Sequence, residues 1–106
     1  MTEAKNEKLK KVTEGAVKEI SAAFRRFSTA GKEEPYAKEI QEIMNMLDTA
    51  LQGITDPAEA LNDIDDTVEF YQEAGKIQQV KAFKAELMKI SAKFLVKGTR
   101  ILAGLL

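Results

Sequence analysis

The stretch from Asp56 to Phe94 constrains the fold most, because it contains a helix start, a break and a second helix. Asp56 and Pro57 are typical of an N-cap residue and the first residue of a helix, and Glu59 is placed for a capping box. Gly75 stands where a helix commonly ends in a left-handed residue. Two helices joined by so short a break are predicted to pack as an antiparallel hairpin.

Apolar residues recur at spacings of three and four along the whole chain, which is typical of amphipathic helices. The expected helices span about residues 2–28, 35–52, 57–74 and 77–97. Their short connections predict an all-α fold, an antiparallel up-down four-helix bundle formed by a single domain over residues 1–106. After Gly98 we expect a short apolar C-terminal tail, either a final helical turn or a loose segment. Gly15, inside the first helix, would be explained by close packing of another helix there.

The composition argues against catalysis, because the chain contains neither histidine, the commonest general base, nor cysteine, the thiol nucleophile. Ser91 beside Lys93 is more simply a polar helix surface than a Ser–Lys catalytic pair. The acidic residues around position 65 lack the spacing of a calcium loop, and a di-iron carboxylate site requires histidines. We therefore expect a protein that is not an enzyme, with no catalytic residues, no metal site and no cofactor.

The expected location is the cytoplasm. No apolar run approaches the roughly 20 residues that span a bilayer. The first residues lead into a charged amphipathic stretch that is unlike a signal peptide. The lack of cysteine fits a reducing compartment.

Charge is divided unevenly along the chain. Residues 1–31 carry a net charge of +3, residues 32–75 one of −10 and residues 76–106 one of +6, which together give −1. In an up-down bundle the first helix neighbours the fourth and the second neighbours the third, so we expect a basic side and an acidic side. Two interpretations stay open. The two sides attract each other within the molecule, at ~0–1 kcal/mol for each exposed pair, or the basic side meets an anionic surface.

The last expected helix is rich in lysine and is followed by apolar residues, which is typical of a contact with an anionic membrane or a membrane protein. Its cations are Lys81, Lys84, Lys89, Lys93, Lys97 and Arg100, and the apolar residues are Ile101, Leu102, Leu105 and Leu106. Nucleic acid is not an expected partner, because the chain is slightly acidic, with a pI of about 5.6. The aromatic residues are also expected mostly on core faces: Phe24, Phe27, Phe70, Tyr71, Phe83 and Phe94.

Several local patterns between about residues 22 and 94 support a family resemblance. They are Glu34-Pro35-Tyr36-Ala37, Ile40-x-x-Ile43-x-x-x-Leu47, Asp56-Pro57, the run from Ile64 to Tyr71, Lys76-Ile77 and Leu87-x-x-Ile90-Ser91. With the chain length, the helix spacing and the positions of the turns, these patterns resemble the bacteriocin immunity proteins of the enterocin A immunity type.

The resemblance implies a cytoplasmic four-helix bundle that protects the producing bacterium from its own class II pore-forming bacteriocin. Such proteins recognise, from inside the cell, a membrane sugar-transporter receptor with bound bacteriocin, and a peripheral contact with the membrane fits this role. Specificity in the family lies largely in the C-terminal half. The partner-binding residues implied here are Lys93, Lys97, Arg100, Ile101, Leu102, Leu105 and Leu106.

Two features depart from the family, because many members are strongly basic and this chain is not, and because its tail is short and apolar. The alternative function is a non-enzymatic cytosolic helical adaptor or dimerisation module. Such a module would use its charge-segregated faces to bind a partner helix.

Overall fold

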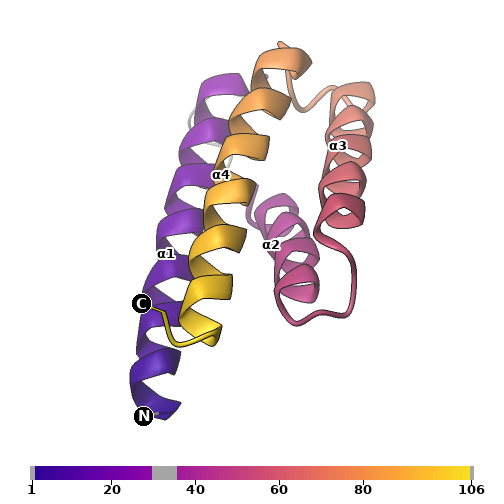
Figure 1. Cartoon of the computed structure of the whole chain (residues 1–106). Coiled ribbons are helices and arrows are strands. Elements are labelled where there is room, and N and C mark those ends of the chain that lie inside the picture. The colour runs from indigo at the N-terminus through magenta and orange to yellow at the C-terminus, as the bar shows by residue number, and fades with distance from the viewer. Residues whose placement is uncertain (1, 30–35, 106) are drawn as a thin grey trace.

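The structure is a computed structural model that describes residues 2–29 and 36–105. It contains four helices, α1 (Thr2–Phe27), α2 (Ala37–Leu51), α3 (Pro57–Glu73) and α4 (Val80–Leu102). The long helices α1 and α4 lie side by side and antiparallel, and the shorter α2 and α3 pack against them (Figure 1). The predicted all-α four-helix bundle is confirmed.

The core is built from the apolar faces that the three-and-four spacing predicted. Each helix contributes side chains with almost no exposed surface, among them Ile20, Ile43, Ile64 and Leu87. At one end of the bundle the buried residues are aromatic. The ring of Phe24 lies 5.3 Å from that of Tyr36 and 5.0 Å from that of Phe83, centroid to centroid, and Phe27 also contacts Phe83.

The aromatic residues lie mostly on core faces, as expected, and Phe70 is the exception among the six named. Phe70 keeps 67% of its surface exposed. The buried stripe of α3 contains Ile64, Val68 and Tyr71, and successive helical residues point about 100° apart. Because Tyr71 occupies the core position, its neighbour Phe70 is turned towards solvent.

The helix ends follow the predicted signals at the connection between α2 and α3. The Asp56 side chain caps α3 by accepting a hydrogen bond from the Ala58 N–H at 2.8 Å, and Pro57 is the first helical residue. Helices α2 and α3 both end in a Schellman motif, with Gly53 and Gly75 at φ values of 78° and 77°. The left-handed backbone at these two turns explains why glycine is found there.

Helix α4 begins later than predicted, at residue 80 and not 77. The backbone before it pairs with the end of α1: the Thr29 N–H donates to the Lys76 carbonyl at 3.0 Å, and the Gln78 N–H donates to the Phe27 carbonyl at 2.9 Å. This bridge holds Ile77 extended and buried against the core. Ile77 therefore belongs to the apolar core, as its spacing suggested, without belonging to the helix.

Helix α4 also ends later than predicted, at Leu102 and not near residue 97. Gly98 lies inside the helix and is buried, and a Cβ there would stand only 2.8 Å from Cδ1 of Leu51. The helix ends instead at Gly104, which has a φ of 78° and takes part in a third Schellman motif. The expected C-terminal tail is thus largely the last turn of α4.

Three smaller differences concern the first two helices. Helix α1 ends at residue 27, and α2 begins at residue 37 because Tyr36, the residue before it, has a left-handed backbone with a φ of 46°. The expected start of the second helix at residue 35 lies outside the described residues. Close packing at Gly15 was also wrong, because nothing lies within 4 Å of a Cβ built there. The close approach occurs at Gly98.

Candidate binding surface

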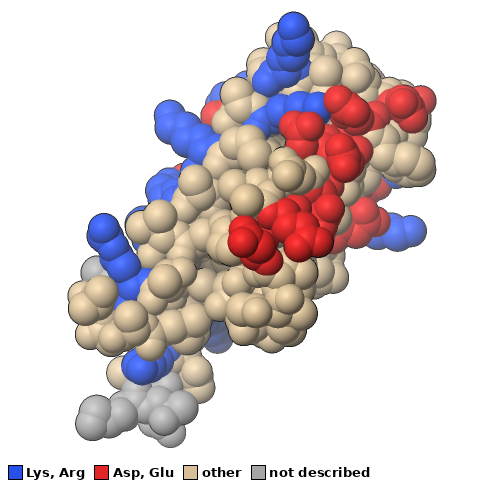
Figure 2. Space-filling model, turned by 45° about the vertical axis from the view of Figure 1, so that its right-hand side comes forward, with Lys and Arg blue, Asp and Glu red and all other residues tan. Residues whose placement is uncertain are grey.

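Charges separate in space as they do along the chain. Helix α1 packs mainly on α4, and α2 packs mainly on α3, as the up-down order predicted. Figure 2 shows Asp and Glu gathered on one side of the molecule, with Lys and Arg along the opposite edge. The molecule therefore presents a basic side, formed by α1 and α4, and an acidic side, formed by α2 and α3.

A few ion pairs join the two sides. Lys84 of α4 contacts Asp65 at 3.1 Å and Glu69 at 2.7 Å, both on α3. The hydrogen bond to Glu69, followed by that to Asp65, raises the pKa of the Lys84 ammonium group. These contacts agree with attraction between the sides, but they engage only a small part of the charge on each.

A groove runs between α1 and α4 on the basic side. It consists of two hollows of about 440 and 390 Å³, which share Glu19, Ile90 and Lys93 in their linings. Most of its apolar lining is buried: Ala16, Ala23, Ile90 and Phe94 are buried, Val12 is half-buried and Ala22 is exposed. We call this feature the α1/α4 groove. It has an apolar floor and a charged rim.

The rim of the α1/α4 groove is strongly cationic. Its charged residues are Lys11, Lys18, Arg26, Lys89, Lys93 and Lys97, with only Glu19 and Glu86 of opposite sign. Both carboxylates are engaged across the groove, Glu19 by Lys93 and Glu86 by Arg26. Within the described parts of the chain, no carboxylate pairs with the other four lysines. The groove therefore carries about four uncompensated positive charges.

The partner-binding residues predicted from the sequence lie in three different environments. Lys93 and Lys97 line the groove, and Arg100 is exposed in the last turn of α4. Leu102 and Leu105 are exposed, at 44% and 74% of their surface. These five predicted residues therefore lie on one accessible surface at the C-terminal end of α4.

One of the predicted residues does not belong to that accessible surface. Ile101 is only 2% exposed and serves the core. Leu106 lies outside the described residues. The end of α4 is also tied to α1, because Nζ of Lys5 donates to the Leu102 carbonyl at 3.2 Å.

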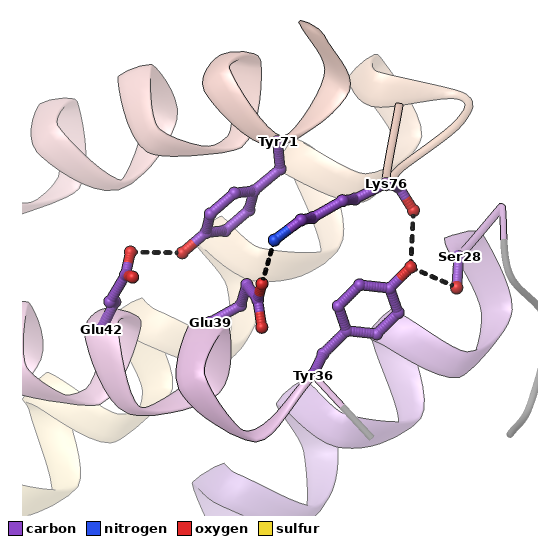
Figure 3. Close-up of polar contacts among 6 residues, drawn as sticks. All are labelled: Ser28, Tyr36, Glu39, Glu42, Tyr71 and Lys76. Carbon is purple, nitrogen blue, oxygen red and sulfur yellow. Dashed lines mark hydrogen bonds and ion pairs between the residues drawn. The ribbon is translucent and has the colours of Figure 1, made fainter. Parts of the chain in front are cut away.

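A polar network at the other end of the bundle was not predicted from the sequence (Figure 3). The Ser28 hydroxyl donates to the Tyr36 hydroxyl at 2.8 Å, and the Tyr36 hydroxyl donates to the Lys76 carbonyl at 3.1 Å. The Lys76 ammonium group pairs with Glu39, a carboxylate that is only 7% exposed. The network joins the end of α1, the start of α2 and the connection between α3 and α4.

The pKa values of Glu39 in this network and of Tyr71 beside it are displaced. Burial opposes ionisation of Glu39, but the hydrogen bond from Lys76, a backbone hydrogen bond and the nearby positive charges of Lys76 and Lys38 together outweigh it. They hold the pKa of this carboxyl below its ordinary value. Burial, followed by the hydrogen bond to Glu42, raises the pKa of the Tyr71 hydroxyl strongly. Tyr71 therefore stays protonated as a donor to the Glu42 carboxylate at 2.7 Å. Both groups are arranged to hold the helices together.

Two features weighed from the sequence as catalytic or metal sites can be located in the structure. Ser91 is fully buried, which corrects its interpretation as a surface residue, and Lys93 is exposed and paired with Glu19. No group of three or more Asp and Glu side chains in the described ranges is placed to hold a metal ion. In residues 2–29 and 36–105, no helix is both long and apolar enough to cross a membrane.

Comparisons of this chain with protein-family models, with characterised proteins and with solved structures gave no match. The resemblance to bacteriocin immunity proteins therefore depends only on the local patterns and helix positions described above. What the structure adds is a class of surface: a cationic groove with an apolar floor on a four-helix bundle.

Proposed function

We propose that this chain acts by binding, as a cytoplasmic immunity protein that protects a bacterium from a class II pore-forming bacteriocin. Its partner would be a membrane sugar-transporter receptor with bound bacteriocin, approached from inside the cell. The observation that carries the proposal is the basic side of the bundle. Uncompensated lysines line its groove, and Arg100, Leu102 and Leu105 are accessible at the end of α4.

The physical basis is the attraction between this side and the inner face of a membrane. Each Lys or Arg near an anionic lipid surface contributes roughly 1 kcal/mol, and nearby apolar side chains add burial in the interface. Leu105 is the most exposed large apolar residue of the described chain and follows directly on the last turn of α4. A peripheral membrane contact would thus bring the groove close to a membrane receptor.

The test is protection of a bacteriocin-sensitive host that expresses the chain, challenged with a panel of class II bacteriocins. We expect selective survival, and we expect the double variant Lys97→Glu/Arg100→Glu to lose it. Truncation after Gly98 is a poorer test, because it also removes the buried Ile101. The matched control is Lys10→Glu/Arg25→Glu, which makes the same change of charge at exposed positions outside the groove lining.

Survival with the control but not with the Lys97→Glu/Arg100→Glu variant would support the proposed site. Protection that persists in the latter variant would place the site elsewhere. No protection by the expressed wild-type chain across a broad panel would contradict the immunity function itself.

A second candidate function is a helical adaptor that binds a partner helix. The separation of charge into two sides favours it, because complementary potentials orient partners and exclude others. Retention of an acidic helical peptide on the wild-type chain at low salt would support an adaptor role. This result would count for an adaptor if expression of the chain did not change the survival of the host under bacteriocin.

A further inference from the structure

The outer face of α3 carries a second surface that the proposed function does not use. Four carboxylates and one aromatic ring are spaced along it at intervals of three and four residues: Glu59, Asp63, Asp66, Phe70 and Glu73. All five are exposed, and they lie on one stripe of the helix. We call this set the α3 stripe.

The charges of the α3 stripe are not used within the molecule. The neighbouring Asp65 and Glu69 both contact Lys84. Among the residues that the structure describes, no cation pairs with the four stripe carboxylates. The stripe is therefore an acidic helix face with Phe70 as an exposed apolar anchor.

We infer that the α3 stripe of one copy of this chain docks into the α1/α4 groove of a second copy. The first reason is charge. The stripe carries four unpaired carboxylates. The groove rim carries four unpaired lysines, which are Lys11, Lys18, Lys89 and Lys97. Each surface carries the charge that the other lacks, and opposite potentials favour both encounter and orientation.

The second reason is length. At 1.5 Å per helical residue, the stripe from Glu59 to Glu73 is about 21 Å long. The groove, which follows α1 from Lys11 to Arg26, is about 22 Å long by the same measure. A helix face of this size therefore fits the groove from end to end.

The third reason is the position of the apolar anchor. Phe70 lies near the Glu73 end of the stripe, and the larger hollow of about 440 Å³ lies near the Lys11 end of the groove. Gly15 in the lining of this hollow has nothing within 4 Å of a Cβ position, so the hollow is open there. Placing Phe70 in it aligns α3 antiparallel to α1 of the receiving copy and brings Glu73 towards Lys97.

The contact is heterologous, because the two surfaces differ. One copy presents its stripe and the other its groove, so each pair keeps one free stripe and one free groove. Wild-type protein is thus expected to form concentration-dependent oligomers larger than dimers. Screening by salt should weaken them, because much of the attraction is between exposed charges. The inference uses the same groove as the proposed function, but it does not require a bacteriocin, a receptor or a membrane.

Two charge-reversed variants test the inference together. Asp63→Lys/Asp66→Lys cancels the net charge of the stripe and keeps the groove, and Lys11→Glu/Lys97→Glu cancels the net charge of the unpaired groove lysines and keeps the stripe. In analytical ultracentrifugation at low salt, wild-type protein should exceed the monomer mass of 11.8 kDa as concentration rises. Each variant alone should stay at the monomer mass. Their equimolar mixture should form a capped 1:1 dimer, because one intact stripe meets one intact groove.

Controls separate this contact from general charge effects. Glu7→Lys/Glu14→Lys makes the same charge change as the stripe variant, at exposed positions of α1 outside the groove lining, and should associate like wild type. Phe70→Ala should weaken association without changing net charge. Circular dichroism checks that each variant is folded.

Three outcomes would overturn the inference: wild-type protein that stays monomeric at low salt, a variant that associates alone, or a mixture that stays monomeric. An acidic peptide or a vesicle of anionic lipid that binds the groove while the wild type stays monomeric would assign the groove to that partner. Since the assay uses purified protein only, its result is independent of protection against bacteriocin.

Discussion

In the part of the chain that the structure describes, two residues other than glycine have a left-handed backbone, and each lies directly before a helix. Tyr36 has a φ of 46° before α2, and Gln79 has a φ of 52° before α4. This conformation costs an L-residue roughly 1–2 kcal/mol. At Tyr36 the cost is offset by stacking on Phe24 and by hydrogen bonds with Ser28 and Lys76. Gln79 is exposed and makes no capping hydrogen bond, so its strain has no such offset.

We therefore predict that Gln79→Gly stabilises the protein relative to Gln78→Gly, by about 1 kcal/mol. The two substitutions are matched, because both remove an exposed glutamine side chain and both add the same freedom to the unfolded chain. Of these two positions, only residue 79 has a positive φ. Urea unfolding of the two variants measures the difference, and equal midpoints would show that Gln79 is not strained.

At the scale of elements, how far the sequence predicts the fold depends on what each signal can specify. The Asp56-Pro57 start and Gly75 after α3 act locally, so they were predicted correctly. Gly98 was taken for a helix end because sequence does not distinguish a left-handed glycine from one that faces a neighbouring helix. Only the position of Leu51, 47 residues earlier in the chain, makes the difference.

The two helical glycines predict opposite responses to alanine. Gly15→Ala should stabilise the protein by about 1 kcal/mol and raise the melting temperature by roughly 4–8 °C, because alanine favours the helix and the site is open. Gly98→Ala should stabilise the protein much less than Gly15→Ala does, or should destabilise it. The reason is that the Cβ of the introduced alanine would lie 2.8 Å and 2.9 Å from the two Cδ atoms of Leu51. Thermal unfolding of both variants gives the comparison.

A double-mutant cycle with Leu51→Ala identifies the cause at Gly98. If the Leu51 side chain is the obstacle, Gly98→Ala should be more favourable by about 1 kcal/mol in the Leu51→Ala background. Equal effects of Gly98→Ala in both backgrounds, or a gain as large as that of Gly15→Ala, would contradict the close contact.

At the scale of the whole molecule, the sequence predicted the two charged sides but neither the groove nor the polar network. The lysines of α4 at positions 89, 93 and 97 share a helix face by their spacing, so half of the groove rim was visible in the sequence. Its other half, Lys11 and Lys18, becomes part of the same rim only when α1 packs on α4. The network likewise joins Ser28, Tyr36 and Lys76, which no local pattern relates.

The ion pair between the buried Glu39 and the partly exposed Lys76 predicts how stability depends on acid. The pKa of Glu39 is below its ordinary value of 4.5 in the folded protein, so the unfolded chain binds the additional proton first as pH falls. The stabilisation is therefore complete above about pH 4.5 and is lost as pH falls through the folded-state pKa. Glu39→Gln should lower stability near pH 7, because it leaves Lys76 without its charged partner, and should flatten the loss of stability below pH 4.5.

Chemical unfolding between about pH 3 and 7 measures this dependence. Glu14→Gln, which changes an exposed carboxylate of α1 outside the network and outside the groove lining, is the matched control and should follow the wild-type curve. Because the Glu39 carboxylate accepts the Lys76 ammonium hydrogen bond, Lys76→Met should flatten the same part of the curve. If Glu39→Gln and the wild type lose stability in parallel as pH falls, the pair does not contribute to acid sensitivity.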